Sequence, residues 1–398
     1  MRILILSPFF YPEPISTGRY NTVLATGLAD AGAEVTVICS HPLYPAWRPQ
    51  YSEAQLPGVE ILRGGHSLRY PQRPFLRRAL LEIWFALFTT FKTWRRGKNV
   101  DLVVAIFPPS LYFAVVSVLL PRRVRRVGIV HDLQGVHAAA SGSLPARLIS
   151  GLIRLVERRA FAACDKLIVL SSAMVQQLSN SMRIEAGRIS VCYPFVNLPE
   201  GQECRRRLEH QFPAKLTHVV YSGALGEKQN PAGLGRIIEK LVADLPSVKV
   251  HIFSEGPSFE QLKGQLASLA TERISFQPLV DEADVAELYR RADIQLIPQA
   301  AGTQHGSMPS KLPNILAGGG TILAICDADS ELAEIVSRFR AGECVHSWEP
   351  EAVALAAARL VRQVQEGIAP VPDGQMAREY FSLDRLLAAI TGQDSLRP

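Results

Sequence analysis

Cysteine is scarce in this sequence, and its spacing excludes a zinc ribbon or a redox pair. No two thiols stand at the short intervals that such sites need, and the stretches Val37-Ile38-Cys39 and Ile325-Cys326 are apolar. This usage is typical of reduced, buried thiols, so we expect a cytoplasmic protein. The six cysteines are Cys39, Cys164, Cys192, Cys204, Cys326 and Cys344.

Targeting and recognition signals are also missing. The apolar run Met1–Leu6 ends before Pro8 and is too short for a signal peptide. No internal repeat of fixed period appears, and no nucleic-acid recognition motif is found. No Gly-x-Gly-x-x-Gly follows the first apolar run, which argues against a nicotinamide-dependent oxidoreductase. We therefore expect an intracellular protein with no nucleic-acid partner.

Length and charge indicate two domains of different character. The chain has 398 residues, of which 47% are hydrophobic and 20% charged, as in folded globular proteins of two domains. The net charge of +6 is unevenly shared, because residues 1–195 are strongly basic and the remainder has an acidic excess. This asymmetry predicts that only the first half faces an anionic partner.

Alternating strand and helix patterns predict the fold. Residues 2–7 read as a buried strand, residues 20–31 as a helix and residues 34–39 as a second strand, which together form a parallel βαβ unit. The alternation continues through the chain and restarts after Pro194, so we predict an α/β protein of two Rossmann-like, doubly wound domains. Further strands are predicted at 101–107, 126–130, 166–170, 218–221, 249–253, 274–276, 294–297 and 322–325, and a last helix at 377–390.

Ligands of such sheets bind beyond the carboxyl ends of the strands. We therefore expect the site in a cleft between the two domains, which face each other through these strand-end loops. The loops are Pro8–Gly18, Pro108-Pro109, His131-Asp132, Gly223–Lys228, Ser254–Pro257 and Gln299–Lys311.

The loop after residues 218–221 carries two glycines and a lysine. Gly223 and Gly226 let the backbone approach a ligand, the following helix offers N–H groups to an anion, and Lys228 adds a positive charge. This combination suits a diphosphate. An ordinary strand-to-helix turn with a solvated lysine is the alternative.

A second basic position lies in the stretch Pro309–Gly320. Ser310 is a candidate helix cap, and Lys311 would then lie in the first helical turn, where a cation opposes the helix dipole. An anionic ligand would remove that conflict. The alternative is a surface lysine.

Two further motifs are weaker. His131-Asp132 ends a strand and is able to bond sugar hydroxyls or assist proton transfer, although a strand-end histidine satisfied by the backbone is common. Asp327-Ala328-Asp329 matches a metal-binding pattern, but aspartate also favours turns and caps. We expect no metal site.

A basic and aromatic segment predicts membrane contact. An apolar run at 79–91 is too short to span a membrane and is flanked by arginines, as in segments that lie among lipid headgroups. A second basic cluster spans Arg122–Arg126. A buried core helix with a solvated basic end is the alternative. The predicted contacts are Arg73, Arg77, Arg78, Trp84, Phe88, Trp94, Arg95 and Arg96.

These motifs together resemble glycosyltransferase family 4, which has the GT-B fold, and within it the branch of colanic acid and exopolysaccharide biosynthesis. The resemblance covers nearly the whole chain, and its last two motifs are the most specific. The motifs are Tyr11-Pro12-Glu13-Pro14 with Gly18, His41-Pro42-Leu43-Tyr44-Pro45, His131-Asp132-Leu133-Gln134, Ser222-Gly223 with Gly226-Glu227-Lys228-Gln229, Gln299, and Pro309-Ser310-Lys311-Leu312 with Asn314-Ile315-Leu316-Ala317.

The resemblance implies a retaining transfer from a nucleoside-diphosphate sugar without an obligatory metal or cofactor. Lys228 would neutralise the departing diphosphate, Gly18 would lie near the donor phosphate, and His131, beside Asp132, would contact the donor sugar. It implies an N-terminal acceptor and membrane domain at 1–193, a donor domain at 194–375 and a C-terminal helix, 376–398, that crosses back onto the first domain. The donor-binding set is Gly18, Arg19, Gly223, Gly226, Gln229, Gln299, Pro309, Ser310, Lys311 and Asn314.

Three positions depart from the family pattern. Ala224 stands where many members have arginine, and Gly306 and Asn314 stand where many have glutamates. Asn314 retains the ability to bond a ribose. We expect Lys311 to supply the cation that Ala224 lacks, and Arg19 to contact phosphate.

The substrates implied by the resemblance are a GDP-fucose or UDP-sugar donor and a lipid-diphosphate-linked oligosaccharide acceptor, used at the anionic inner face of the cell membrane. Two alternatives remain. A GT-B sugar-nucleotide epimerase shares the fold but has no reason to touch a membrane. A non-catalytic nucleotide-sugar-binding subunit is compatible with the missing glutamates.

Overall fold

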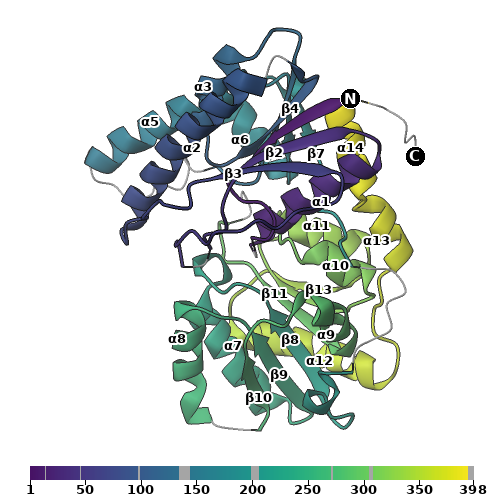
Figure 1. Cartoon of the computed structure of the whole chain (residues 1–398). Helices are drawn as coiled ribbons and strands as arrows, with labels where there is room; N and C mark the ends of the chain where they lie inside the picture. The colour runs from purple at the N-terminus through teal and green to yellow at the C-terminus, as the bar shows by residue number, and fades with distance from the viewer. Residues whose placement is uncertain are drawn as a thin grey trace. The chain divides into compact units, whose positions relative to one another are not determined.

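The computed structural model describes residues 1–13, 15–44, 46–96, 99–133, 144–198, 206–269, 272–303 and 308–392. The chain divides into two compact units (Figure 1). Unit 1 comprises Met1–Pro194 and Leu383–Pro398, and unit 2 comprises Phe195–Ser382. Each unit is built on its own parallel sheet, which confirms the predicted pair of doubly wound α/β domains.

Unit 1 holds a seven-stranded sheet in the order β3-β2-β1-β4-β5-β6-β7. The reversal between β1 and β4 makes the switch point at which Rossmann-like sheets bind ligands. All six residues of β4 are apolar and buried, as expected of a parallel strand covered on both faces. The strands are β1 Arg2–Leu6, β2 Glu34–Ser40, β3 Val59–Gly64, β4 Leu102–Phe107, β5 Arg125–Val130, β6 Lys166–Val169 and β7 Ile189–Val191; the helices are α1 Ser16–Asp30, α2 Pro74–Arg96, α3 Leu111–Leu119, α5 Leu144–Ala162, α6 Ser172–Met182 and α14 Leu383–Thr391.

Unit 2 holds a six-stranded sheet in the order β10-β9-β8-β11-β12-β13. Its switch point lies between β8 and β11. The strands are β8 Thr217–Ser222, β9 Val248–Phe253, β10 Ile274–Gln277, β11 Ile294–Pro298, β12 Ile322–Ile325 and β13 Gly342–Val345; the helices are α7 Pro231–Asp244, α8 Pro257–Leu266, α9 Val285–Arg291, α10 Leu312–Ala317, α11 Glu331–Arg338, α12 Pro350–Gln365 and α13 Gly374–Tyr380.

Helix boundaries follow local chemistry. The side chain of Asn230 accepts a hydrogen bond from Gly233 N at 3.2 Å, and Pro231 occupies the first helical position, so α7 starts there. The helix predicted at 20–31 begins earlier, at Ser16. The helix predicted at 377–390 is two helices, α13 and α14, which are separated at 381–382.

The last helix packs within unit 1. A methyl group added to Gly27 of α1 would lie 2.9 Å from the side chain of Leu383 at the start of α14, so the two helices meet closely. A larger residue at position 27 would therefore require the Leu383 side chain to shift. Figure 1 shows α14, in yellow, beside the purple α1.

The connection between β2 and β3, residues 41–58, has no helix among its described residues. Parallel strands are usually joined by a helical crossover, and loops of this length inside a compact domain are usually functional. The next connection, residues 65–73, joins β3 to α2. Both leave the carboxyl edge of the sheet.

Candidate functional site

The loop after β8 contains two glycines, Gly223 and Gly226. Gly223 has φ +140°, a conformation that side chains disfavour, and its N–H donates to Phe253 O at 3.0 Å. The N–H of Gly226 donates to Gln229 Oε1 at 3.0 Å. The amide oxygen of Gln229 therefore shapes the loop itself.

Lys228 lies in a short turn of 3-10 helix, Glu227–Gln229, immediately before α7. Lys228 is exposed, and its backbone carbonyl accepts a hydrogen bond from Ala300 N at 2.8 Å. This bond ties the lysine turn to the loop that follows β11. Lys228 is thus placed at the N-terminus of a helix of 14 residues, where an anion is favoured.

Lys311 is placed differently from the prediction. It is the N-cap residue of α10 and not a residue of its first turn, and Ser310 is exposed and does not cap the helix. The ammonium Nζ donates to Ser222 O at 3.2 Å and lies 4.2 Å from the ring centroid of Tyr221. The lysine therefore joins α10 to the start of the Gly223 loop.

Burial lowers the pKa of Lys311 to about 7, because little water reaches the ammonium group. The phenol of Tyr221, whose ring lies under it, donates to Ala224 O at 2.6 Å. One carbonyl and one aromatic face are weak compensation for a buried cation. An anionic ligand beside Lys311 would raise its pKa again.

Two more of the predicted donor residues, Gln299 and Pro309, belong to unit 2. Gln299 follows β11, where its N–H donates to Ile325 O at 2.8 Å and its buried Oε1 has no partner among the described residues. Pro309 accepts a hydrogen bond through its carbonyl in the turn before α10. Gly306 lies outside the described residues.

The side chain of Asn314 is hydrogen-bonded to another residue of unit 2. Its Nδ2 donates to Asn197 Oδ1 at 2.5 Å, and its Oδ1 accepts from Asn197 N at 2.9 Å. A ribose would have to compete with this reciprocal pair. The sequence gives no local signal for it, since the two residues are far apart in the chain.

In unit 1, Gly18 and Arg19 lie in the first turn of α1 and not in a loop. An added methyl group at Gly18 would lie 2.9 Å from both Cβ and O of Glu13, so the glycine accommodates that residue. The buried Glu13 carboxylate accepts from Leu43 N at 2.9 Å and Tyr44 N at 2.7 Å. Burial raises the pKa of Glu13, and these two bonds oppose the rise.

His131 directly follows β5, and its ring lies edge-on to Tyr20 at 4.8 Å. Desolvation lowers the pKa of His131 to about 4, against the opposing effect of the Asp132 charge. The imidazole is therefore neutral near pH 7, and its buried Nε2 has no partner among the described residues. Asp132 Oδ1 accepts from Leu133 N at 3.0 Å. Gln134 lies outside the described residues.

Three of the predicted membrane residues are half-buried and contact other side chains of unit 1. Trp84 and Phe88 stack on each other at 5.3 Å and pack against the core of unit 1. The guanidinium of Arg77 lies 4.2 Å above the ring of Trp47. Apolar residues occur all around α2, so the sequence alone did not reveal which of them face the core.

The exposed face of α2 is nevertheless apolar with basic flanks. Arg73, Arg78, Trp94 and Arg95 are exposed, whereas the side chain of Arg96 lies outside the described set. Helix α3 packs on α2 and α5 on α3, and Figure 1 shows the three side by side. Their exposed large apolar residues are Phe75, Leu76, Ile83, Leu87, Phe91 and Trp94 of α2, Val115, Val118 and Leu119 of α3, and Leu152 and Leu155 of α5. Within the described ranges, no helix is both long and apolar enough to cross a membrane.

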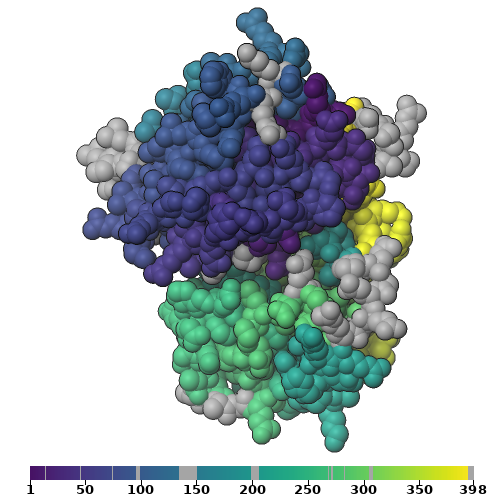
Figure 2. Space-filling model, viewed as in Figure 1, coloured from purple at the N-terminus to yellow at the C-terminus, as the bar shows by residue number. Residues whose placement is uncertain are grey.

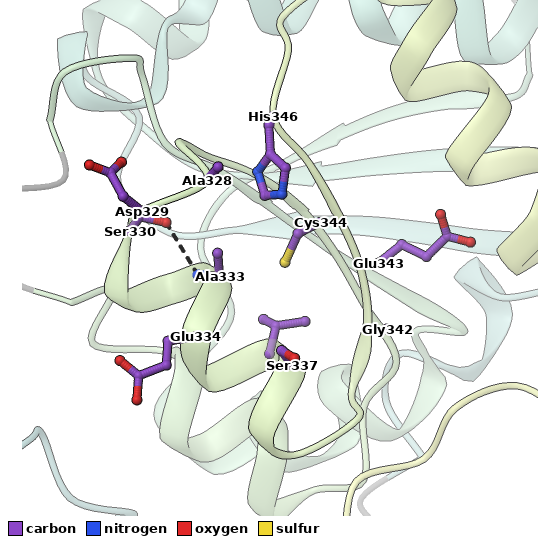
Figure 3. A pocket seen from close by; sticks show the side chains of 11 residues that line it. Ala328, Asp329, Ser330, Ala333, Glu334, Ser337, Gly342, Glu343, Cys344 and His346 are labelled. Carbon is purple, nitrogen blue, oxygen red and sulfur yellow. Dashed lines mark hydrogen bonds between the residues drawn. The ribbon is translucent and has the colours of Figure 1, made fainter.

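A cavity of about 690 Å³ lies between α11 and β13, apart from the predicted residues. Figure 3 shows Cys344 and His346 pointing into it, and the Ser330 hydroxyl, which caps α11, accepting from Ala333 N at 3.2 Å. Asp329 lines this cavity.

The two aspartates of the Asp327-Ala328-Asp329 motif have different surroundings. The Asp327 carboxylate accepts from Gly302 N at 2.8 Å, whereas Asp329 faces the cavity. In the part of the chain that the structure describes, no group of three or more His, Cys, Asp or Glu is placed to hold a metal ion.

Sequence reasoning singled out the loop at Ser254 but missed that residue itself. Ser254 follows β9, is fully buried, and its hydroxyl has no partner among the described residues. Tyr221 was predicted only as the last residue of a strand, with no part in the site. A serine directly after a buried strand was the available signal.

Two family models match the chain in succession. Residues 17–200 match "Glycosyltransferase Family 4", and residues 205–366 match "Glycosyl transferases group 1". A protein assigned to colanic acid biosynthesis, the glycosyl transferase WcaI of Escherichia coli K12, is 26% identical over 96% of this chain and 95% of its own length. The phosphatidyl-myo-inositol mannosyltransferase of Mycolicibacterium smegmatis is 24% identical over 81% of this chain and 76% of its own.

Solved structures agree on the fold. WaaG, a glycosyltransferase of lipopolysaccharide biosynthesis, superposes with a TM-score of 0.71 at 15% identity and covers 98% of this chain and 100% of its own. The sucrose-phosphate synthase of Thermosynechococcus elongatus superposes with a TM-score of 0.72 at 17% identity, over 99% and 98%. Both are similar to this chain in each of its parallel-sheet units.

Proposed function

The chain belongs to the GT-B glycosyltransferases, with a family 4 half followed by a group 1 half, and from this premise we propose that it transfers a sugar with retention from a nucleoside-diphosphate sugar to a lipid-linked saccharide. The pathway would be the synthesis of a cell-surface polysaccharide. The observation that carries the proposal is the pair of lysines at the carboxyl edge of unit 2.

These lysines suit the diphosphate of the donor. Lys311 holds the carbonyl of Ser222 at the start of the glycine loop, and Lys228 stands exposed at its end. Cations and a helix N-terminus aimed at a leaving diphosphate stabilise the charge that develops as the glycosidic bond breaks. On this reasoning no metal or cofactor is obligatory for the transfer.

His131 suits a hydrogen-bonding role better than an acid–base role. Its pKa of about 4 keeps the imidazole neutral, so it has little capacity to hold a proton near pH 7. A neutral imidazole with an unpartnered, buried Nε2 is a suitable partner for a sugar hydroxyl. Asp132 would keep the strand end in place beside it.

The acceptor and membrane assignments rest on unit 1 and on the relatives. The apolar face of α2, α3 and α5 includes Leu87, which is 69% exposed, and Leu155, which is 63% exposed. Exposed apolar residues flanked by arginines favour an anionic lipid surface. One relative is named for colanic acid and another for a phosphatidyl-inositol acceptor, which supports a lipid-linked saccharide at the inner face of the membrane. GDP-fucose and UDP-sugars are the donors to test first.

The first experiment is a thermal-shift screen of the purified protein against UDP, GDP, dTDP and their sugar conjugates, with and without Mg²⁺. A ligand that binds only the folded state raises the melting temperature. A shift with one nucleotide, equal in both conditions, supports the donor proposal. Conversion of a sugar nucleotide by the protein alone would indicate an epimerase, and binding without turnover in the presence of membranes would indicate a non-catalytic subunit.

Membrane contact is tested separately with vesicles that contain phosphatidylglycerol. Leu87→Glu introduces a charge into the exposed apolar face, so we expect weaker co-sedimentation than for the wild type. Exposed Leu355 of unit 2 offers a matched control, Leu355→Glu, that should sediment like the wild type. Equal sedimentation of all three proteins would count against this face.

A further inference from the structure

Two cysteines lie close together on neighbouring strands of the unit 2 sheet. Ala324 of β12 pairs with Cys344 of β13 in the parallel register, and Cys326 stands two residues after Ala324. Because side chains alternate along a strand, both thiols project from the same face of the sheet. Little of the segment 326–346 shows on the face of the molecule drawn in Figure 2, so its surroundings are best followed in Figure 3.

The two thiols are in hydrogen-bond contact. The Cys344 thiol donates to the sulfur of Cys326. The backbone holds this pair in place, because Cys326 N donates to Val345 O at 3.1 Å and the ring nitrogen Nδ1 of His346 lies 3.0 Å from Cys326 O. The sulfurs are therefore adjacent before any reaction takes place, as the formation of a disulfide requires.

The surroundings of Cys326 favour its thiolate form. The Ser330 hydroxyl, which is the N-cap of α11, donates to the Cys326 sulfur, so this thiol also lies at the positive end of a helix. The hydrogen bond from Cys344 has the largest effect and lowers the pKa of Cys326 to about 7. Ser330 and His346 add to this effect, whereas burial and the Asp327 charge oppose it. A large share of Cys326 is therefore thiolate near pH 7.

The other cysteines in the described part of the chain lack such surroundings. Burial raises the pKa of Cys39 to about 12 and that of Cys192 to about 11. It also raises the pKa of Cys164. These thiols stay protonated near pH 7, and a protonated thiol reacts slowly. Oxidation should therefore select the pair in unit 2.

The pair opens onto the cavity of about 690 Å³ between α11 and β13. Figure 3 shows Cys344 and His346 pointing into this cavity, and Cys344 is half-buried whereas Cys326 is only 3% exposed. A reagent that enters the cavity therefore meets Cys344 first. Three carboxylate residues line the cavity and disfavour an anionic reagent, which leaves small neutral molecules as the best candidates. They are Asp329, Glu334 and Glu343.

We propose that Cys326 and Cys344 form a reversible dithiol–disulfide site that a small neutral hydroperoxide oxidises through this cavity. The Cys344 sulfur attacks a peroxide oxygen, and its proton passes to the Cys326 thiolate along the existing hydrogen bond. The O–O bond breaks, the leaving hydroxide or alkoxide takes a proton from water, and Cys344 becomes a sulfenic acid.

The second step closes the disulfide. The Cys326 sulfur attacks the sulfenic sulfur of Cys344, the S–S bond forms, and the thiol proton leaves with the sulfenic hydroxyl as water. Two electrons have then passed from the thiol pair to the peroxide. Reduction by an external dithiol restores both thiols. Neither step involves a donor or an acceptor, so the site is independent of the proposed transfer.

The test counts the thiols of the full chain after treatment with hydrogen peroxide at pH 7, removal of the peroxide with catalase, and denaturation. The wild type should lose two of its six thiols, and dithiothreitol should restore them. Arg338 and Arg340 lie between the two cysteines, so trypsin separates them unless a disulfide joins their peptides. Mass spectrometry of the digest then identifies the pair.

Two variants and a second reagent sharpen the test. Cys344→Ser and Cys326→Ser should give no joined peptides, and their untreated melting temperatures should match that of the wild type. Cys192→Ser, at a half-buried cysteine of unit 1, is the matched control and should still lose two thiols. Anionic glutathione disulfide should oxidise the wild-type pair at least about tenfold more slowly than the same concentration of hydrogen peroxide.

Three outcomes would overturn the proposal. The wild type keeps all six thiols at doses that oxidise free cysteine, the joined peptides contain other cysteines, or Cys344→Ser loses as many thiols as the wild type. Equal rates with glutathione disulfide and peroxide would overturn the choice of a neutral hydroperoxide. Nucleoside-diphosphate binding is measured separately, so none of these results bears on the proposed transfer.

Discussion

Replacing Lys311 with methionine removes a buried ammonium group and keeps an unbranched side chain of similar length. The pKa of this lysine is about 7 in the folded protein, against 10.5 for the ordinary group. Each pKa unit corresponds to about 1.4 kcal/mol, so the protonated form costs at most about 5 kcal/mol. The substitution is therefore expected to stabilise the free protein near neutral pH.

The pH dependence has a definite sign. Between pH 7 and pH 10.5 the unfolded chain keeps the proton on this lysine and the folded protein has released it, so the free energy of unfolding rises with pH. Lys311 should contribute about 2 kcal/mol of that rise between pH 7 and pH 9. Urea denaturation of wild type and Lys311→Met at both pH values isolates this contribution, because other groups titrate equally in the two proteins.

Donor binding should respond in the opposite direction. A hydrogen bond to a charged group contributes about 1.5–3 kcal/mol, so Lys311→Met is expected to weaken nucleoside-diphosphate binding about 10- to 100-fold at pH 7. Lys215→Met, at an exposed lysine of the same unit, is the matched control. The reasoning is refuted if Lys311→Met keeps the wild-type pH slope and the wild-type affinity.

Three further predictions concern other ionisable groups. Lys228→Ala should lower kcat, measured by nucleotide release, about 10²- to 10³-fold, because a charge-stabilising group at the leaving diphosphate is lost. The melting temperature should change little. An unchanged kcat would show that Lys228 takes no part in the mechanism. Glu82→Ala should lower stability by about 1–3 kcal/mol in urea titrations, since the buried Glu82 carboxylate accepts from two backbone N–H groups at the start of α3; a neutral effect would show that water replaces it. Burial lowers the pKa of His251 to about 3 and also lowers that of His218, 2.9 Å away. Below pH 6.5 this histidine therefore takes up a proton in the unfolded chain but not in the folded protein. Through His251 the free energy of unfolding should fall by about 2 kcal/mol between pH 7 and pH 5, and in His251→Phe this fall should be smaller. Equal pH slopes in the wild type and the variant would contradict this assignment.

Much of the fold was predictable because local patterns determine it. Apolar runs such as 102–107 end at prolines or glycines, and the alternation of strands with helices permits few topologies. The edge strands β3, β7 and β13 were missed, since they are less apolar and less buried. The break between α13 and α14 at residues 381–382 was also missed.

The site was predictable in its loops but not in its pairings. The bond from Lys311 to Ser222 joins residues 89 positions apart, and the pair Asn197 and Asn314 is 117 positions apart. Spacing along the chain carries no information on such contacts. The side chain of Trp84 illustrates the same point, because a helix with apolar residues on all sides does not reveal which of them a neighbouring loop will cover.

The return of the chain to unit 1 at Leu383 has a consequence for synthesis in the cell. Unit 1 takes its last helix, α14, from the final residues of the chain, and that helix packs closely on α1 near the beginning. A ribosome therefore exposes all of unit 2 before it releases the segment that completes unit 1. The first domain to be translated is the last to be finished, and until then the surface of α1 that contacts Leu383 stays uncovered.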